Sequence, residues 1–123
     1  MSDDPTSIAR RSYQAYVDKD RAAIEDLIGP DFRFTSPLDN GIDRDTYFER
    51  CWPNSKTLDS FTFVHLVRDG ERVFATYEAS TSSGTHFRNT EILTVRDGKI
   101  VDAQVYFGWS LPHEAAPGTS KIP

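Results

Sequence analysis

The spacing of apolar residues changes at Leu58, and that change constrains the fold more than any other feature. Before Leu58, apart from one short alternating segment at 32–37, the apolar residues recur every three or four positions, which is typical of helices that pack one face on a core. From Leu58 onward they alternate in long segments separated by glycine turns, namely RDGE (68–71), SSGT (82–85) and RDGK (96–99). Helices followed by an antiparallel meander predict an α+β domain with the helices on one face of a curved sheet.

Three helices are expected in the first half, each behind an aspartate that can cap it. Asp4 precedes a proline at the start of the first helix, Asp20 caps a shorter second helix, and Asp43 caps a third. Gly29-Pro30 ends the second, and the third ends near Pro53 because the residue before a proline avoids helical geometry. The inward residues of the first two helices are Ile8, Ala9, Ser12, Tyr13, Ala15, Tyr16, Val17, Ala23, Ile24, Leu27 and Ile28.

Strand alternation predicts which side chains face the core. In the segment FRFTSP (32–37), alternation places Ser36 on the same side as the two phenylalanines. The turn-rich segment LDNG (38–41) then ends that strand. The last two strands each offer one mainly apolar face: Phe87, Asn89, Glu91, Leu93 and Val95, and Val101, Ala103, Val105, Phe107 and Trp109.

The strand at residues 72–81 has two acceptable facings. A three-residue loop with Gly84 in the left-handed conformation pairs Tyr77 with Asn89, whereas a two-residue loop pairs Glu78 with Asn89. We favour Tyr77 on the inner side, since its face is the more apolar. With Glu78 inside instead, Glu78 and Glu91 would be near neighbours and could divide acid and base roles.

Charge and composition argue against several classes of function. The formal net charge is -5 and the lysines and arginines are scattered, which does not favour a nucleic-acid partner. Cys51 is the only cysteine, so no internal disulfide or cysteine-based metal cluster is expected. Glycine-rich cofactor motifs are also missing, and we expect no cofactor. No apolar run approaches the roughly 20 residues of a membrane span, and MSDDPTS does not resemble a signal peptide, so a cytoplasmic location is expected.

Glu91 is the most informative residue of the sequence. Its position predicts a carboxyl group among apolar side chains, where an unpaired charge is costly, so it should be neutral, paired or functional. Burial raises a carboxyl pKa, by up to roughly 3–5 units, and a neutral acid can donate a hydrogen bond to a carbonyl or enolate oxygen. The alternative is that Glu91 pairs with an arginine at the mouth of the fold.

Other polar residues are weaker candidates. Asn89 lies about 7 Å from Glu91 along the strand, and it either faces a ligand or satisfies a polar neighbour. Tyr13 and Tyr16 either donate hydrogen bonds into a pocket or serve as core residues. Asp39 could reach a pocket as a base, although turn aspartates mostly bond their own backbone.

The order of these elements resembles the nuclear-transport-factor-2-like (NTF2-like) superfamily, in its ketosteroid-isomerase and SnoaL-like polyketide-cyclase branch. The resemblance covers about residues 7–110 and is carried by DKDRAAIEDLIGPDFRFTSPL, CWPNS and DGKIVDAQVYFGW. It implies a cone of three helices on a strongly curved mixed or antiparallel sheet around a pocket. The domain would span residues 5–110, with a tail at 111–123. It also implies a homodimer through the outer sheet face, which would carry His86, Arg88, Thr90, Ile92 and Tyr106.

The resemblance assigns roles to particular positions. The general base of the isomerases falls at Ser36, which cannot play that part, and the tyrosine that polarises the substrate falls at Ser12, beside Tyr13 and Tyr16. The protonated acid matches Glu91. The pocket aromatic matches Trp52, and the apolar wall of the last strand matches Ala103, Val105 and Phe107.

The expected function is binding of a small apolar carbonyl compound. In an isomerase, cyclase or dehydratase, Glu91, Asn89 and Tyr16 would be catalytic. The ligand-binding residues would be Tyr13, Ser36, Trp52, Tyr77, Leu93, Ala103, Val105 and Phe107. Because Ser36 is no base, a non-catalytic dimeric module that binds a hydrophobic molecule is the alternative. A cone packed solid by its aromatic residues is the third.

Overall fold

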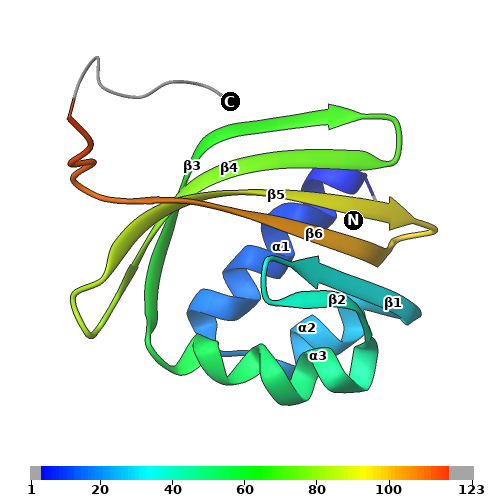
Figure 1. The fold of residues 1–123 in the computed structure, drawn as a ribbon. Coiled ribbons are helices and arrows are strands. Elements are labelled where there is room, and N and C mark those ends of the chain that lie inside the picture. Colours follow the sequence, from blue (N-terminus) through cyan, green and yellow to red (C-terminus); the bar gives the residue numbers. More distant parts are fainter. Residues whose placement is uncertain (1–3, 117–123) are drawn as a thin grey trace.

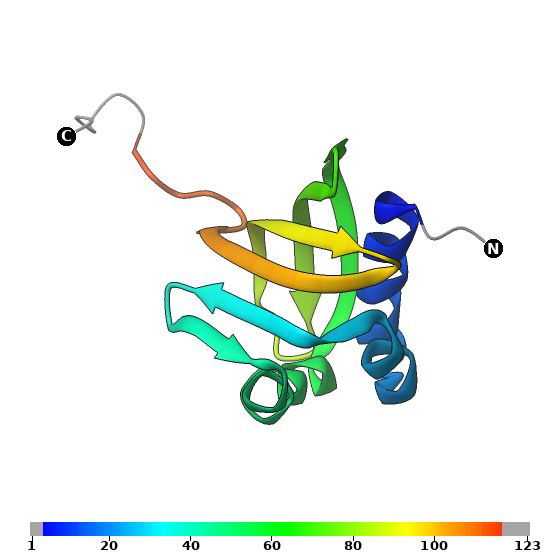
Figure 2. The same cartoon turned by 90° about the vertical axis from the view of Figure 1, so that its right-hand side faces the viewer.

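The computed structural model describes residues 4–116 and has the α+β architecture that the sequence predicts (Figure 1). The helices are α1 (Pro5–Asp18), α2 (Arg21–Leu27), α3 (Arg44–Arg50) and the 3₁₀ helix η1 (Trp52–Lys56). The strands are β1 (Ile28–Ser36), β2 (Asp39–Asp43), β3 (Leu58–Asp69), β4 (Arg72–Thr81), β5 (His86–Arg96) and β6 (Lys99–Ser110). Figure 2 shows α1 (blue) along one side of the curved sheet and α3 (green) at its lower end.

The sheet is mixed and strongly curved. In the described part of the chain its six strands follow the order β2-β1-β6-β5-β4-β3, and the two edge strands do not pair, so the sheet is not closed. Strands β3 to β6 form the predicted antiparallel meander, whereas β1 runs parallel to β6. The core lies between the inner sheet face and the helices, where Ile8, Ile24, Phe32 and Val73 are the largest fully buried side chains.

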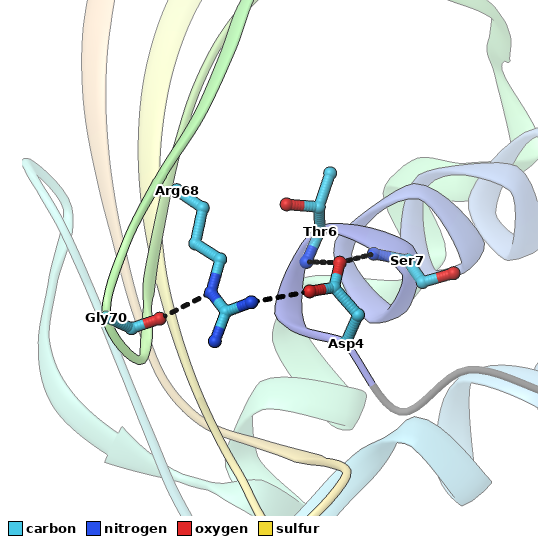
Figure 3. A network of polar contacts seen from close by, with 5 residues as sticks. All are labelled: Asp4, Thr6, Ser7, Arg68 and Gly70. Atoms are coloured by element: carbon cyan, nitrogen blue, oxygen red, sulfur yellow. Dashed lines mark hydrogen bonds and ion pairs between the residues drawn. The ribbon is translucent and has the colours of Figure 1, made fainter.

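A cap and an ion pair fix the start of α1 (Figure 3). One carboxylate oxygen of Asp4 accepts hydrogen bonds from the backbone N–H groups of Thr6 and Ser7, at 3.1 and 3.3 Å. The other oxygen pairs with Arg68 of β3 at 2.6 Å. Arg68 also donates from Nε to the carbonyl oxygen of Gly70 at 2.8 Å. The predicted cap therefore also ties the helix to the β3–β4 turn.

Asp20 and Asp43 cap α2 and α3 as predicted, but two boundaries differ from expectation. Ile28 begins β1 instead of ending the second helix. Segment 38–41, expected to be a turn, runs into strand β2, whose single apolar residue was too weak a signal. The third helix ends before Pro53 as predicted, at Arg50, and Pro53 lies in the first turn of the separate 3₁₀ helix η1, where a proline is tolerated.

The turn between β4 and β5 has the three-residue form. Gly84 adopts a φ of +90° and Tyr77 pairs with Asn89, as we favoured. Tyr77 is therefore buried on the inner side. Glu78 lies on the outer side, where it forms an ion pair with Arg88.

Two β-bulges correct the predicted inner face of β6. Near its start the register shifts, so that Ile100 is buried and Val101 joins the outer side with Asp102. Near its end Gly108 is the extra residue, so that Trp109 lies opposite Arg88. Val101 and Trp109 therefore do not share the face of Ala103, Val105 and Phe107, because each bulge reverses the alternation.

Strand β6 ends at Ser110, and residues 111–116 follow without regular structure. The rest of the predicted tail, 117–123, lies outside the described residues. Among the described residues, no helix has both the length and the apolar character needed to cross a membrane.

Gly108 is required by its closeness to the neighbouring strand. A Cβ atom there would lie 2.0 Å from the carbonyl oxygen of Arg88, so the backbone would have to move. We expect Gly108→Ala to lower the free energy of unfolding by about 3 kcal/mol, at the upper end of what overpacking typically costs, because the clash is with backbone. Gly70→Ala is the control, because Gly70 has a φ of +61° but open space around it, and should cost only about 1 kcal/mol. Urea unfolding measures the free energy of unfolding of both variants. Equal losses would contradict the conclusion that Gly108 is required by its closeness to the backbone of Arg88.

Candidate functional site

A cavity of about 940 Å³ lies between the helices and the inner face of the sheet. Every helix and strand of the described chain contributes to its lining, and most of the lining is apolar or aromatic. The lining includes ten of the eleven residues assigned from the sequence: Tyr13, Tyr16, Ser36, Tyr77, Asn89, Glu91, Leu93, Ala103, Val105 and Phe107. The eleventh, Trp52, instead packs against Tyr16, with ring centroids 5.0 Å apart.

Glu91 and Tyr13 form the polar centre of this cavity. The Tyr13 hydroxyl donates to Oε1 of Glu91 at 2.9 Å, across 78 positions of sequence. The rings of Phe61, Phe63 and Tyr77 surround Tyr13, with centroids 4.9, 5.1 and 5.3 Å away. In the described part of the chain no arginine forms an ion pair with Glu91. Its partner is thus a neutral phenol.

The apolar surroundings govern the protonation of this pair. Burial raises the pKa of Glu91 to about 7, and the hydrogen bond from Tyr13 offsets part of that rise. Burial likewise raises the pKa of each cavity tyrosine: Tyr13, Tyr16, Tyr47 and Tyr77. At neutral pH the tyrosines are therefore hydrogen-bond donors, and a large share of Glu91 is the neutral acid.

A second tyrosine pair lies beside the first. The hydroxyl groups of Tyr16, from α1, and Tyr47, from α3, are hydrogen-bonded to each other. Tyr47 packs against Phe32 and Phe34 of β1, with both centroids 5.0 Å away. The sequence placed Tyr16 among the catalytic residues, but it is Tyr13 that contacts Glu91.

Asn89 has a structural task. Its Oδ1 accepts a hydrogen bond from the backbone N–H of Gly108 at 3.0 Å, which satisfies the bulge in β6. Asn89 also interacts with the Tyr77 hydroxyl, which lowers the pKa of Tyr77 against the larger effect of burial. Asn89 therefore stabilises the bulge of β6 next to β5, the strand that also carries Glu91.

A second carboxylate lies where the β1–β2 hairpin borders the cavity. Oδ1 of Asp39 is 2.7 Å from Nη2 of Arg50, and Oδ2 accepts a hydrogen bond from Ser36 Oγ at 3.1 Å. The sequence considered Asp39 but missed Tyr47 and Arg50. Their spacing with Cys51, at i, i+3 and i+4 of one helical segment, was the available signal, since such residues share a face.

The other polar groups offer little chemistry. Burial raises the pKa of the Cys51 thiol to about 11, so it is not a thiolate nucleophile at neutral pH. Within residues 4–116, no group of three or more His, Cys, Asp or Glu side chains could hold a metal ion.

The raised pKa of Glu91 predicts a pH-dependent stability. An unfolded glutamate ionises near pH 4.5, whereas the folded one stays protonated up to about 7, so folding stability falls between these values and levels off above them. Glu91→Gln removes this loss. It should match the wild type below about pH 4.5 and exceed it by on the order of 3 kcal/mol at pH 8. Urea unfolding at a series of pH values measures the difference in unfolding free energy between Glu91→Gln and the wild type. A difference that does not change with pH would contradict the raised pKa of Glu91.

Solved structures with a similar fold are diverse. A provisionally assigned ketosteroid isomerase from Kribbella flavida has a TM-score of 0.73 at 16% identity, covering 97% of this chain and 90% of that one. An NTF2-like protein of unknown function from Cytophaga hutchinsonii has a TM-score of 0.74 at 15% identity, covering 88% and 93%. An LEH-like epoxide hydrolase from M. tuberculosis has a TM-score of 0.70 at 15% identity, covering 85% and 82%. At these identities the likeness shows the fold alone.

Sequence comparison agrees with the fold. The search of curated proteins found no significant match. The sequence model of the SnoaL-like domain matches residues 9–103, which is most of the chain: it starts within α1 and includes the strands that carry Glu91 and Ser36. The chain therefore belongs to the SnoaL-like domain family and has an NTF2-like fold.

Proposed function

We propose that the cavity binds a small, largely apolar molecule with a carbonyl group, and that Glu91 stabilises negative charge on its oxygen. One observation carries the proposal. A carboxyl group lies inside an aromatic cavity with a tyrosine, and not an arginine, as its hydrogen-bond partner. A structural ion pair would satisfy the charge, whereas this arrangement favours the neutral acid.

The neutral acid can serve two partners at once. Its Oε1 accepts from Tyr13, and a protonated Oε2 can donate to a ligand oxygen. Such a donor gains strength when it is aimed at developing charge in a site that excludes water. An enolate or another oxyanion is the species it would stabilise. The reaction class that fits is isomerisation, cyclisation or dehydration through an enolate.

A second candidate is a binding module without catalysis. Ser36 supports it, because its hydroxyl lies where the resemblance places a catalytic carboxylate, and it donates to Asp39 at 3.1 Å. Both candidates require the cavity to take up an apolar ligand, so turnover separates them. A wild-type protein that binds such ligands without accelerating any proton transfer would favour the module.

Binding of an oxyanion should depend on the proton of Glu91. The ligand is 2,4-dinitrophenol, an aromatic anion between about pH 6 and 9, and calorimetry measures its affinity. Affinity should be constant below pH 7 and fall about tenfold per pH unit above it, because the ionised Glu91, whose pKa is about 7, repels the anion. Glu91→Gln should flatten this dependence. Glu78→Gln, an outer-face control, should keep it. A fall of equal slope in Glu91→Gln would contradict the proposal.

We also propose that two copies pair through the outer sheet face. There Tyr106 is 54% exposed, and the hydroxyl groups of Thr76 and Thr90 are 2.8 Å apart beside Ile92. Light scattering after size exclusion should give twice the mass of the chain for the wild type and the monomer mass for Ile92→Lys. A monomeric wild type at micromolar concentration would refute the pairing.

A further inference from the structure

One ionisable group of the cavity has no counter-charge. In the described part of the chain, the charged side chains of the lining are Asp39, Arg50 and Glu91. Asp39 and Arg50 form an ion pair, with 2.7 Å between Oδ1 and Nη2, and so compensate each other. Glu91 has the neutral phenol of Tyr13 as its partner. When Glu91 loses its proton, the cavity therefore holds an uncompensated negative charge, which is costly in apolar surroundings.

Aromatic rings at steep angles to one another lie beside this charge. Phe61 is nearly perpendicular to Tyr13 and to Tyr77, with interplanar angles of 79° and 87° and centroids 4.9 Å from both. Tyr13 and Tyr77 are 5.3 Å apart, and all three rings line the cavity. The face of an aromatic ring attracts a cation within about 6 Å of its centroid, and rings set in different directions form the cages that bind alkylated ammonium groups.

The strand register leaves space for alkyl groups next to Glu91. Its partners on the two neighbouring strands are Ala75 of β4 and Val105 of β6, and both have short side chains. Oε1 of Glu91 accepts the hydrogen bond from Tyr13, which leaves Oε2 for a ligand. The site thus combines one available acceptor oxygen with room for the methyl groups of a ligand.

We propose that the ionised form of Glu91 binds a tertiary ammonium ion with apolar substituents in this cavity. Oε2 accepts a hydrogen bond from the single N–H of the ligand, and the rings of Tyr13, Phe61 and Tyr77 lie around its alkyl groups. A primary ammonium would leave two N–H groups without partners in the same place. The inference goes beyond the proposed function, which uses the neutral acid. The two ligand classes exclude each other, because they need Glu91 in opposite protonation states.

Among the groups that face Glu91, only its own proton exchanges near neutral pH. Burial raises the pKa of every neighbouring phenol and thiol, so that all stay neutral: Tyr13 and Tyr16 of α1, Tyr47 of α3, Cys51 after it, and Tyr77 of β4. The described lining residues of β1, β3 and β6 have no acidic or basic side chain. With a pKa of about 7, Glu91 is ionised above neutral pH. Affinity for a cation should therefore rise with pH up to about 7, opposite in sign to that for an oxyanion.

The test is calorimetry with N,N-dimethylbenzylamine, which is protonated between about pH 5 and 8. Isobutylbenzene is its neutral isostere, with carbon in place of nitrogen. At pH 8 the wild type should bind the amine about tenfold or more tighter than isobutylbenzene. Affinity for the amine should fall about tenfold from pH 7 to pH 6, as Glu91 takes up its proton.

Three variants identify the groups responsible. Glu91→Gln should remove the preference for the amine at every pH. Phe61→Leu should weaken binding of the amine about threefold more than that of isobutylbenzene, because leucine has no ring face. Glu78→Gln, on the outer face, is the matched control and should bind both ligands as the wild type does.

Equal affinity for the amine and isobutylbenzene at pH 8, or an equal preference in Glu91→Gln, would overturn the ammonium site. Binding of 2,4-dinitrophenol separates this inference from the proposed function. If the wild type binds that anion with the expected pH dependence but does not prefer the amine, the ammonium site alone fails. If it prefers the amine through Glu91 and does not bind the anion, the ammonium site stands and the oxyanion site fails.

Discussion

The curved sheet has a larger inner surface than the helices cover, and the rest of the molecule depends on this mismatch. Only α1 is long, with 14 residues, whereas α2 and α3 have seven residues each. Bulges such as the one at Gly108 allow the strands to bend around the helices. The apolar rows of β4, β5 and β6 therefore border a cavity as well as a core.

Withdrawal of water from that cavity determines how its polar groups behave. Each buried group needs a partner, and the partners come from distant elements: Tyr13 for Glu91, Tyr47 for Tyr16, and the Gly108 backbone for Asn89. The same desolvation raises the pKa of Glu91 to about 7. Desolvation thus explains both why the polar groups of the cavity wall are paired and why a neutral acid lies among them.

The two carboxyl groups of the cavity have opposite environments. Glu91 lies on a central strand among aromatic rings and contacts a phenol. Asp39 lies on the edge strand β2 and contacts a guanidinium. Position in the sheet decides this difference, because a central strand is covered on its inner face and an edge strand admits a charged partner from α3.

The sequence alone determined the features that a few neighbouring residues encode. These were the helix caps at Asp4, Asp20 and Asp43, the glycine turns of the meander, and the inward facing of Glu91. Tertiary structure decided the rest: the partner of Glu91, the bulges of β6, and the attachment of Asp39 to Arg50. The physical reason is range. Periodicity and capping act within a few positions, whereas these contacts depend on strand register and on how the helices cross the sheet, which the local pattern does not contain.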